Sequence, residues 1–198
     1  DKVTGFDMEL IAEIGKVAGF EVEVKNQAFD GLLPALQSGK IDLIIAGMTV
    51  TDERKKAVDF SESYYTASQV IIVPADNAAI KSFDDLKGKN VGVQIGTTGD
   101  TVISEIKEIT NTKYNNGSEA VLALTTQKVD AVVIDNEPAK NFVAKNTGLK
   151  VVDTGAVKED YAIAIAKGNK ELLDKVNTGL KTLKENGKYD ELIAKWFK

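Results

Sequence analysis

Helix-type and strand-type patterns of apolar residues alternate along almost the whole chain. Apolar residues recur at helical spacing over 10–18, and Gly19 follows as a stop signal. Apolar and charged residues alternate over 20–24, which predicts a half-buried strand. Continuous apolar runs at 42–46 and 69–73 predict strands that are covered on both faces.

The rest of the chain continues this scheme. Further strands are expected at 90–94, 130–134 and 161–166, and further helices at 32–38, 100–109, 119–126, 137–145, 172–183 and 192–197. Strands that alternate with helices in this way predict an α/β fold with mainly parallel sheets.

Two segments in different halves of the chain resemble each other. Residues 32–47 and 121–135 each contain a helix pattern, a turn of Lys, an apolar residue and Asp, and an apolar strand. When Lys40 is aligned with Lys128, Gly47 and Asp135 fall just past the carboxyl ends of matching strands. Ligands of open α/β sheets bind at such ends, so two similar lobes would place both positions on one cleft. The alternative is that any two helix–strand units look this similar.

Composition removes several function classes. The 198 residues include 25 basic and 30 acidic ones, with a net charge of −5 and no basic stripe for nucleic acid. Cysteine and histidine are both absent, which excludes disulfides, thiolate chemistry, Cys/His zinc sites and histidine-based triads. No apolar run approaches the ~18 residues of a spanning helix.

The segment 46–60 holds the first candidate group. It leaves the expected strand at 42–46 and offers the hydroxyl of Thr49. Thr51 or Asp52 can cap a short helical turn that carries Arg54, whose planar fork matches a carboxylate. The alternative is a solvated, charged face, which we accept for the other charged residues of this turn.

The segment 91–101 is the second candidate. Small residues turn between a strand and a helix, so helix N-terminal N–H groups near Thr97 and Thr98 can bind an anion. The segment lacks both the ending of a phosphate-binding loop and the spacing GxGxxG. One carboxylate is therefore the better guest, and a plain tight turn is the alternative.

Two further side chains are candidates for ligand contact. Asp135 directly follows four apolar residues, where a desolvated carboxylate needs a cationic partner such as a ligand ammonium. The competing interpretation is a helix N-cap formed by Asp135 or Asn136. Phe29 lies in a loop, where an aromatic ring is either a hydrophobic staple or a flat wall against a ligand side chain.

Taken together, the segments resemble the amino-acid-binding proteins of ABC importers, the solute-binding family 3 for polar amino acids. The resemblance runs in order through VTGFDMELIAEI (3–14), FDGLLPALQSGKIDLIIAGMTVTDERKKAVDFSESYY (29–65), DLKGKNVGVQIGTTGD (85–100), KVDAVVIDN (128–136) and NGKYDELIAKWF (186–197). The second block is specific to this family.

The resemblance implies a role for each candidate. Arg54 would clamp the ligand α-carboxylate with N–H groups near Thr49 and Thr98, and Asp135 would take the α-ammonium with the Gly47 carbonyl and the Thr49 hydroxyl. The full implied set of ligand-binding residues is Phe29, Ala46, Gly47, Met48, Thr49, Arg54, Gln94, Thr97, Thr98 and Asp135. In this set Phe29 would stack on the ligand side chain and Gln94 would touch its distal end.

The implied fold is the two-lobed periplasmic-binding-protein type II fold (Venus flytrap), with crossing strands near 68–73 and 160–165 as a hinge. Lobe one would hold residues 1–69 and 162–198, and lobe two residues 70–161. Family members begin with a further strand and loop that this chain lacks. The chain is then truncated or permuted, or the segment is disordered, processed away or supplied by another chain, which leaves an oligomer or a domain swap open.

The implied function is capture of a polar L-amino acid in the cleft and delivery to an ABC permease, outside the cytoplasm, in the periplasm or on a cell-surface lipoprotein. Glutamine, arginine, lysine and histidine are the candidate ligands, and the protein is expected to be no enzyme and to need no cofactor or metal. The alternatives are a dehydratase-type enzyme on the same scaffold, a ligand-sensing domain of a receptor, and a designed or reconstructed family member.

Overall fold

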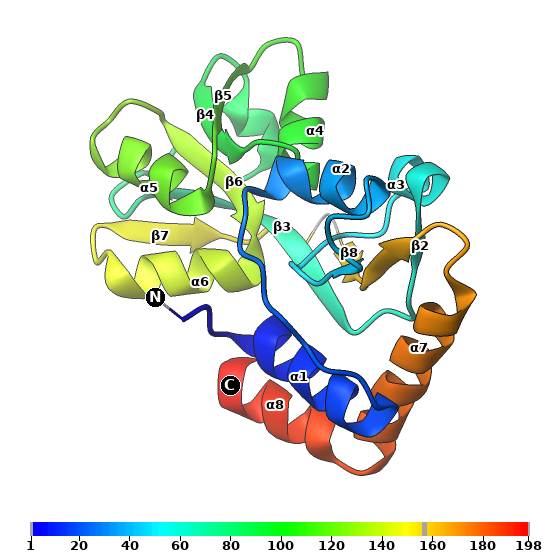
Figure 1. Ribbon diagram of the computed structural model, residues 1–198. Coiled ribbons are helices and arrows are strands. Elements are labelled where there is room, and N and C mark those ends of the chain that lie inside the picture. Colours follow the sequence, from blue (N-terminus) through cyan, green and yellow to red (C-terminus); the bar gives the residue numbers. More distant parts are fainter. Residues whose placement is uncertain (1, 156–157, 198) are drawn as a thin grey trace. The chain divides into compact units, whose positions relative to one another are not determined.

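The computed structural model describes residues 2–155 and 158–197, and the chain divides into two compact units (Figure 1). Unit 1 comprises Asp1–Gln27, Gly31–Tyr65 and Asp160–Lys198, and unit 2 comprises Ala28–Asp30 and Thr66–Glu159. Each unit therefore combines segments that are distant in the sequence. The hinge function that we predict for the two crossings stays a prediction.

Unit 1 combines a small sheet with a layer of helices. Its helices are α1 (Phe6–Ala18), α2 (Leu32–Gln37), α3 (Asp52–Ala57), α7 (Lys170–Glu185) and α8 (Lys188–Phe197). Its strands are β1 (Leu43–Ile44), β2 (Val58–Phe60) and β9 (Ala164–Ala166), in the order β1-β9-β2. Helix α1 packs against α7 and α8 (Figure 1), and a Cβ atom at Gly179 would lie 2.9 Å from the Ile14 side chain. Glycine at 179 thus permits the close approach of α1 and α7.

Unit 2 is built around a larger mixed sheet. Its strands are β3 (Tyr65–Pro74), β4 (Asn90–Gln94), β5 (Thr110–Tyr114), β6 (Ala131–Asp135) and β7 (Leu149–Val152), in the order β5-β4-β6-β3-β7, with β8 (Lys158–Tyr161) paired to β3. Its helices are α4 (Thr98–Glu105), α5 (Gly117–Thr125) and α6 (Asn136–Lys145), and 3-10 turns lie at Phe29–Gly31 and Phe83–Leu86.

Strand β3 explains why its sequence reads as a continuous apolar run. Val70 and Ile72 belong to one buried cluster, whereas Ile71 and Val73 belong to the other. Because successive side chains of a strand point to opposite faces, β3 supplies core to both sides of the sheet.

The prediction of mainly parallel sheets is wrong. Strand β9 runs antiparallel to β1 and β2, and β3 runs antiparallel to β6 and β7; only β4 has parallel partners, β5 and β6, among the pairings of the described residues. Parallel neighbours require a crossover connection, usually a helix. Helices do lie between β3 and β6 and between β1 and β9 in the chain, so the alternation of helices and strands does not by itself specify the orientation of these pairs.

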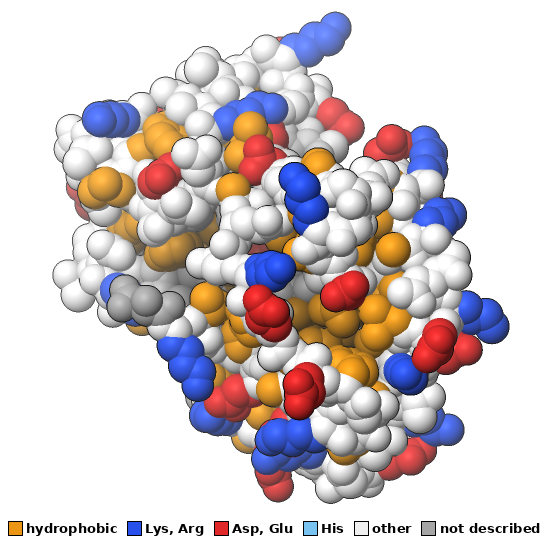
Figure 2. Space-filling model, in the orientation of Figure 1, with side chains coloured by type: hydrophobic (Ala, Val, Ile, Leu, Met, Phe, Trp, Pro, Cys, Tyr) orange, Lys and Arg blue, Asp and Glu red, His pale blue; other side chains and the backbone are white. Residues whose placement is uncertain are grey.

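The predicted strand at 20–24 is also wrong, and the strand at 42–46 shrinks to Leu43–Ile44. Val22 is 38 % exposed and Val24 is 48 % exposed. Residues 20–25 and 40–45 line a groove of about 570 Å³ whose apolar lining includes Met8 and Ile11 of α1. Figure 2 shows hydrophobic side chains in this hollow. An extended segment becomes a strand only when a neighbour pairs with it, and the groove occupies the place of that neighbour.

Candidate ligand-binding half-sites

The unit 1 half-site is the loop that follows β1. Gly47 has φ +56°, a left-handed conformation, and a Cβ atom there would lie 3.3 Å from the Tyr161 ring. Thr49 forms an antiparallel bridge with Tyr161, and Met48 is fully buried. Glycine at 47 is therefore required both for the turn and for the contact with the ring.

Asp7 of helix α1 anchors this loop through a hydrogen bond. The Gly47 N–H donates to the Asp7 carboxylate at 2.8 Å and lies 3.2 Å from the Tyr64 hydroxyl oxygen. Burial raises the pKa of the Asp7 carboxyl to about 6, although hydrogen bonds from Gly47 and Tyr64 act in the opposite direction. Sequence reasoning missed this role because an acid in the first turn of a helix already has an explanation in the helix dipole.

Arg54 is fixed at the other end of the loop. The Thr51 hydroxyl caps α3 by accepting the Arg54 N–H at 3.1 Å, so Thr51 rather than Asp52 is the cap. The Arg54 guanidinium donates to the Thr49 carbonyl at 2.7 Å, and the residue is only 9 % exposed. The neighbouring charged residues of α3, Asp52, Glu53, Lys55 and Lys56, are exposed as expected for a solvated face.

The unit 2 half-site is a connected row of polar side chains. The Gln69 amide nitrogen donates to Asp135 at 2.7 Å and to the Thr98 hydroxyl at 2.9 Å. The Thr98 hydroxyl in turn donates to the Glu159 carboxylate at 2.8 Å. Gln69 is 1 % exposed and Glu159 is 5 % exposed, so the row is largely withdrawn from solvent.

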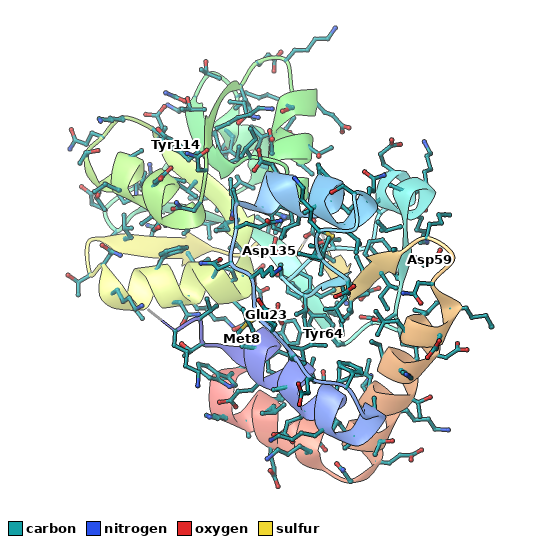
Figure 3. The ribbon with its side chains drawn as sticks, viewed as in Figure 1. Met8, Glu23, Asp59, Tyr64, Tyr114 and Asp135 are labelled. Carbon is teal, nitrogen blue, oxygen red and sulfur yellow. The ribbon has the colours of Figure 1, made fainter. Side chains whose placement is uncertain are left out.

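The structure decides against the capping role for Asp135. Asp135 occupies the N-cap position of α6, but its side chain makes no capping hydrogen bond there. The side-chain amide oxygen of Asn136 does not replace it, because this oxygen accepts the Ser68 N–H at 3.0 Å. Asp135 lies at the carboxyl end of β6 (Figure 3), where its carboxylate accepts from Gln69 instead.

The turn between β4 and α4 is built as the sequence suggested. The Thr97 hydroxyl caps α4 by accepting the Asp100 N–H at 3.3 Å, and it donates to the Gln94 carbonyl at 2.8 Å. Gly96 has φ +79°, and a Cβ atom there would lie 3.1 Å from Asp30. The glycine therefore lets the segment Ala28–Asp30, which carries Phe29, lie against this turn within unit 2.

Sequence reasoning named two members of the polar row, Asp135 and Thr98, and missed Gln69 and Glu159. Gln69 begins the apolar run at 69–73, and a polar residue that heads a buried strand was the available signal. Gln69 and Thr98 connect Asp135 to a second acid, Glu159, through hydrogen bonds.

Within residues 2–155 and 158–197 there is no group of three or more acidic, histidine or cysteine side chains that could hold a metal ion. In the same ranges, no helix combines the length and the apolar character that crossing a bilayer requires.

Known proteins give the family context. The model of the bacterial extracellular solute-binding proteins, family 3, matches residues 1–198. The chain is 39% identical over 200 residues to a probable histidine-binding protein of Campylobacter jejuni, covering 98% of this chain and 77% of the relative. It is 39% identical over 203 residues to an arginine-binding extracellular protein of Bacillus subtilis, covering 100% and 79%.

Solved structures agree with this family. An ancestral arginine-binding protein bound to arginine superposes with a TM-score of 0.96 at 48% identity, covering 100% of this chain and 89% of that one. An ancestral amino-acid-binding protein described as a precursor of cyclohexadienyl dehydratase gives a TM-score of 0.92 at 43% identity, covering 100% and 87%. The predicted type II periplasmic-binding fold is confirmed by these structures.

Proposed function

Because the chain belongs to the bacterial extracellular solute-binding proteins of family 3, we propose that it captures a polar L-amino acid for an ABC importer. The observation that carries the proposal is a matched pair of fixed charges. Arg54 is held by hydrogen bonds in unit 1, and Asp135 is held by Gln69 in unit 2. A cation and a carboxylate held in this way complement the α-carboxylate and the α-ammonium of a zwitterion.

The α-carboxylate is assigned to Arg54. One guanidinium nitrogen donates to the Thr49 carbonyl, which fixes the plane of the group. Backbone N–H groups of the loop at Thr49 and of the first turn of α4 at Thr98 would complete the binding of the anion. Ala46 and Met48 supply the backbone of the same loop.

The α-ammonium is assigned to Asp135. One carboxylate oxygen accepts from Gln69, so the carboxylate has a fixed orientation before a ligand arrives. A fixed anion loses less entropy on binding than a mobile one. The Gly47 carbonyl and the Thr49 hydroxyl would provide the other acceptors of the ammonium, as the family resemblance implies.

The ligand side chain is assigned to Phe29, Gln94 and the acid that the structure adds, Glu159. Phe29 would supply a flat apolar wall and Gln94 a hydrogen-bonding amide. The Glu159 carboxylate accepts from Thr98. An acidic group on the polar row favours arginine, lysine or histidine over glutamine, and we propose a basic amino acid as the ligand, with glutamine as the second candidate.

We propose that the protein binds its ligand without catalysing a reaction. The two carboxylates of unit 2 are the observation that favours the other candidate, a dehydratase-type enzyme, and the similar dehydratase precursor belongs to the same fold. Both carboxylates are hydrogen-bonded to fixed side chains, which suits holding a ligand. Incubation with the ligand followed by NMR separates the candidates, because an enzyme would convert the ligand and a binding protein would return it unchanged.

The family consists of bacterial extracellular solute-binding proteins. We propose that this protein works outside the cytoplasm, either free in a periplasm or attached to a cell surface as a lipoprotein. Its proposed protein partner is the membrane permease of the importer. We also propose that the groove of unit 1 accepts a β-strand from polypeptide outside residues 1–198, including another chain, because residues 20–25 and 40–45 border it without pairing to each other. Light scattering over a concentration series detects the oligomer that a strand from another chain would produce, and a monomer at every concentration would exclude that source of the strand.

The first experiment is a thermal-shift panel of the twenty amino acids. A ligand present at 100 times its dissociation constant stabilises the folded state by about 2.7 kcal/mol. A selective rise of the melting temperature with L-arginine, L-lysine, L-histidine or L-glutamine is the expected result. A cooperatively melting protein that responds to none of the twenty would overturn the proposal.

A further inference from the structure

We propose that Asp7 is a positioning residue of the unit 1 half-site: it fixes the Ala46–Gly47 peptide and, with it, the φ of Gly47, whose carbonyl is assigned to the ligand. This inference rests on the proposed function, because it assigns the loop at Ala46–Thr49 to amino-acid binding. Asp7 belongs to α1 and is 40 positions from Gly47 in the sequence, and no role was expected for it.

The geometry makes Asp7 a direct control on one peptide group. The Gly47 N–H donates to the Asp7 carboxylate at 2.8 Å. The described chain contains no cis peptide bond, so the Ala46 carbonyl points away from the Gly47 N–H across a planar group. While the N–H is held towards Asp7, the carbonyl of Ala46 is turned to the opposite side of the loop. Rotation of this peptide would exchange an acceptor for a donor on that side.

The loop needs such an anchor because glycine alone does not select a conformation. Gly47 populates left-handed and right-handed regions with similar ease, so φ +56° is selected by its surroundings. The Tyr161 ring limits the space on one side of Gly47, and the Asp7 carboxylate provides the acceptor on the other. Hydrogen bonds to a carboxylate are shorter and stronger than those to a neutral acceptor.

The surroundings of Asp7 are otherwise weakly charged. The titratable group in contact with Asp7 is the phenol of Tyr64, which also contacts Gly47. The ring of Tyr161 packs next to Tyr64, with 6.1 Å between the ring centroids. Burial raises the pKa of the Tyr64 hydroxyl well above its ordinary value, so Tyr64 stays protonated near neutral pH. Tyr64 is itself fixed, since its carbonyl accepts from the Tyr189 hydroxyl.

This environment gives the anchor a proton-dependent strength. Burial raises the pKa of the Asp7 carboxyl to about 6, so the group is charged at pH 8 and largely neutral at pH 5. A neutral carboxyl is a weaker acceptor for the Gly47 N–H. Affinity for the amino acid should therefore fall as the pH is lowered through about 6, in the range where an exposed aspartate would remain charged.

The test compares Asp7→Ala with the isosteric Asp7→Asn. The carbonyl oxygen of Asn can still accept the Gly47 N–H but cannot titrate, whereas Ala offers no acceptor. We expect the dissociation constant for L-arginine at pH 8, measured by calorimetry, to rise at least ten-fold in Asp7→Ala and less than three-fold in Asp7→Asn. The part of the affinity change between pH 8 and pH 5 that belongs to Asp7 should be absent in Asp7→Asn.

An NMR titration keeps the inference separate from the identity of the ligand. The amide signal of Gly47 in the ligand-free protein should shift with a midpoint near pH 6 in the wild type and should stay constant in Asp7→Asn. If the wild type binds none of the twenty amino acids but this signal still titrates, the proposed function fails while the Asp7–Gly47 contact stands. Normal affinity in a folded Asp7→Ala would overturn the inference, and so would a Gly47 amide signal that does not titrate in the wild type. If Asp7→Ala does not fold, the NMR titration of the wild type still decides.

Discussion

The half-sites of the two units are held in place by different means. In unit 1 the conformation of the loop holds the half-site in place. Gly47 has a left-handed φ, Asp7 accepts its N–H, and Arg54 donates to the Thr49 carbonyl. In unit 2 the regular strand β6 ends at Asp135, and hydrogen bonds between side chains hold the half-site in place. One site is therefore sensitive to backbone strain and the other to the loss of a single hydrogen-bonding group.

Under the proposed function, the two half-sites would also offer a ligand different groups. Unit 1 presents a cation and backbone groups, whereas unit 2 presents two carboxylates, Asp135 and Glu159, joined through Thr98 and Gln69. A zwitterion with a cationic side chain matches one positive and two negative groups. Substitutions in the two units should therefore change binding in different ways.

The largest effect is expected for Arg54→Ala. Removing one partner of a desolvated, hydrogen-bonded charge pair costs on the order of 2–5 kcal/mol, so affinity for the amino acid should fall by about 30-fold or more. Calorimetric titration with L-arginine measures this change. The variant should also lose about 1 kcal/mol of folding stability, because the Thr49 carbonyl loses its buried donor.

Arg54→Lys is the matched control for charge. Lysine keeps the positive charge but lacks the planar fork that contacts Thr49 and a carboxylate together. We expect affinity between that of the wild type and that of Arg54→Ala. If Arg54→Ala bound the amino acid with wild-type affinity, Arg54 would not be the group that binds the ligand carboxylate. The proposed difference in charge between the two half-sites would then be wrong.

The second effect concerns stability and belongs to Asp7. Its pKa is raised from 3.8 to about 6, so the folded state binds this proton more tightly than the unfolded state. The resulting stabilisation is fully present below pH 3.8 and is lost as the pH rises through 6. Urea unfolding from pH 4 to pH 8 should show the wild type gaining up to ~3 kcal/mol over Asp7→Asn as the pH falls. A constant difference between the two proteins would contradict the buried position of this carboxyl.

The third effect tests the row in unit 2. Asp135→Asn removes the charge offered to the α-ammonium and should weaken L-arginine binding about 10- to 100-fold, or ~2 kcal/mol, while the fold is retained. Gln69→Met is the comparison variant, because it keeps the charge and the volume but removes the donor to Asp135. We expect a smaller loss for Gln69→Met. Unfolding of Asp135→Asn would instead support a purely structural role.

How many residues of each half-site could be proposed from the sequence depended on how far apart those residues lie along the chain. The unit 1 loop and Arg54 lie within one segment, 46–54, so their local pattern could be interpreted together. Gln69, Thr98, Asp135 and Glu159 come from four segments, and only the strand pairing of β3 with β6 brings Gln69 opposite Asp135. Such a contact depends on strand register, which the alternating pattern does not specify between distant strands.

The fold shows the same limit. Periodicity located most helices and buried strands, because burial of one face or both faces leaves a mark on each segment separately. It failed for the orientation of β3 and β9 and for the strand at 20–24, because each of these depends on a neighbour elsewhere in the chain. The pairing partner, rather than the intrinsic preference of the segment, decided the outcome.

The smallest effect is expected for Gln94→Leu, which changes preference rather than overall binding. The Gln94 carbonyl accepts from Thr97, and this backbone contact survives the substitution, so the turn before α4 should keep its shape. Only the side-chain amide is lost, which is worth about 1 kcal/mol for a ligand that bonds to it. Dissociation constants for L-glutamine and L-arginine should therefore change relative to each other by up to about ten-fold. Thr101→Ala, an exposed change on the neighbouring helix α4, should leave the ratio of the two dissociation constants unaltered. An unaltered ratio in Gln94→Leu as well would remove Gln94 from the residues that set specificity.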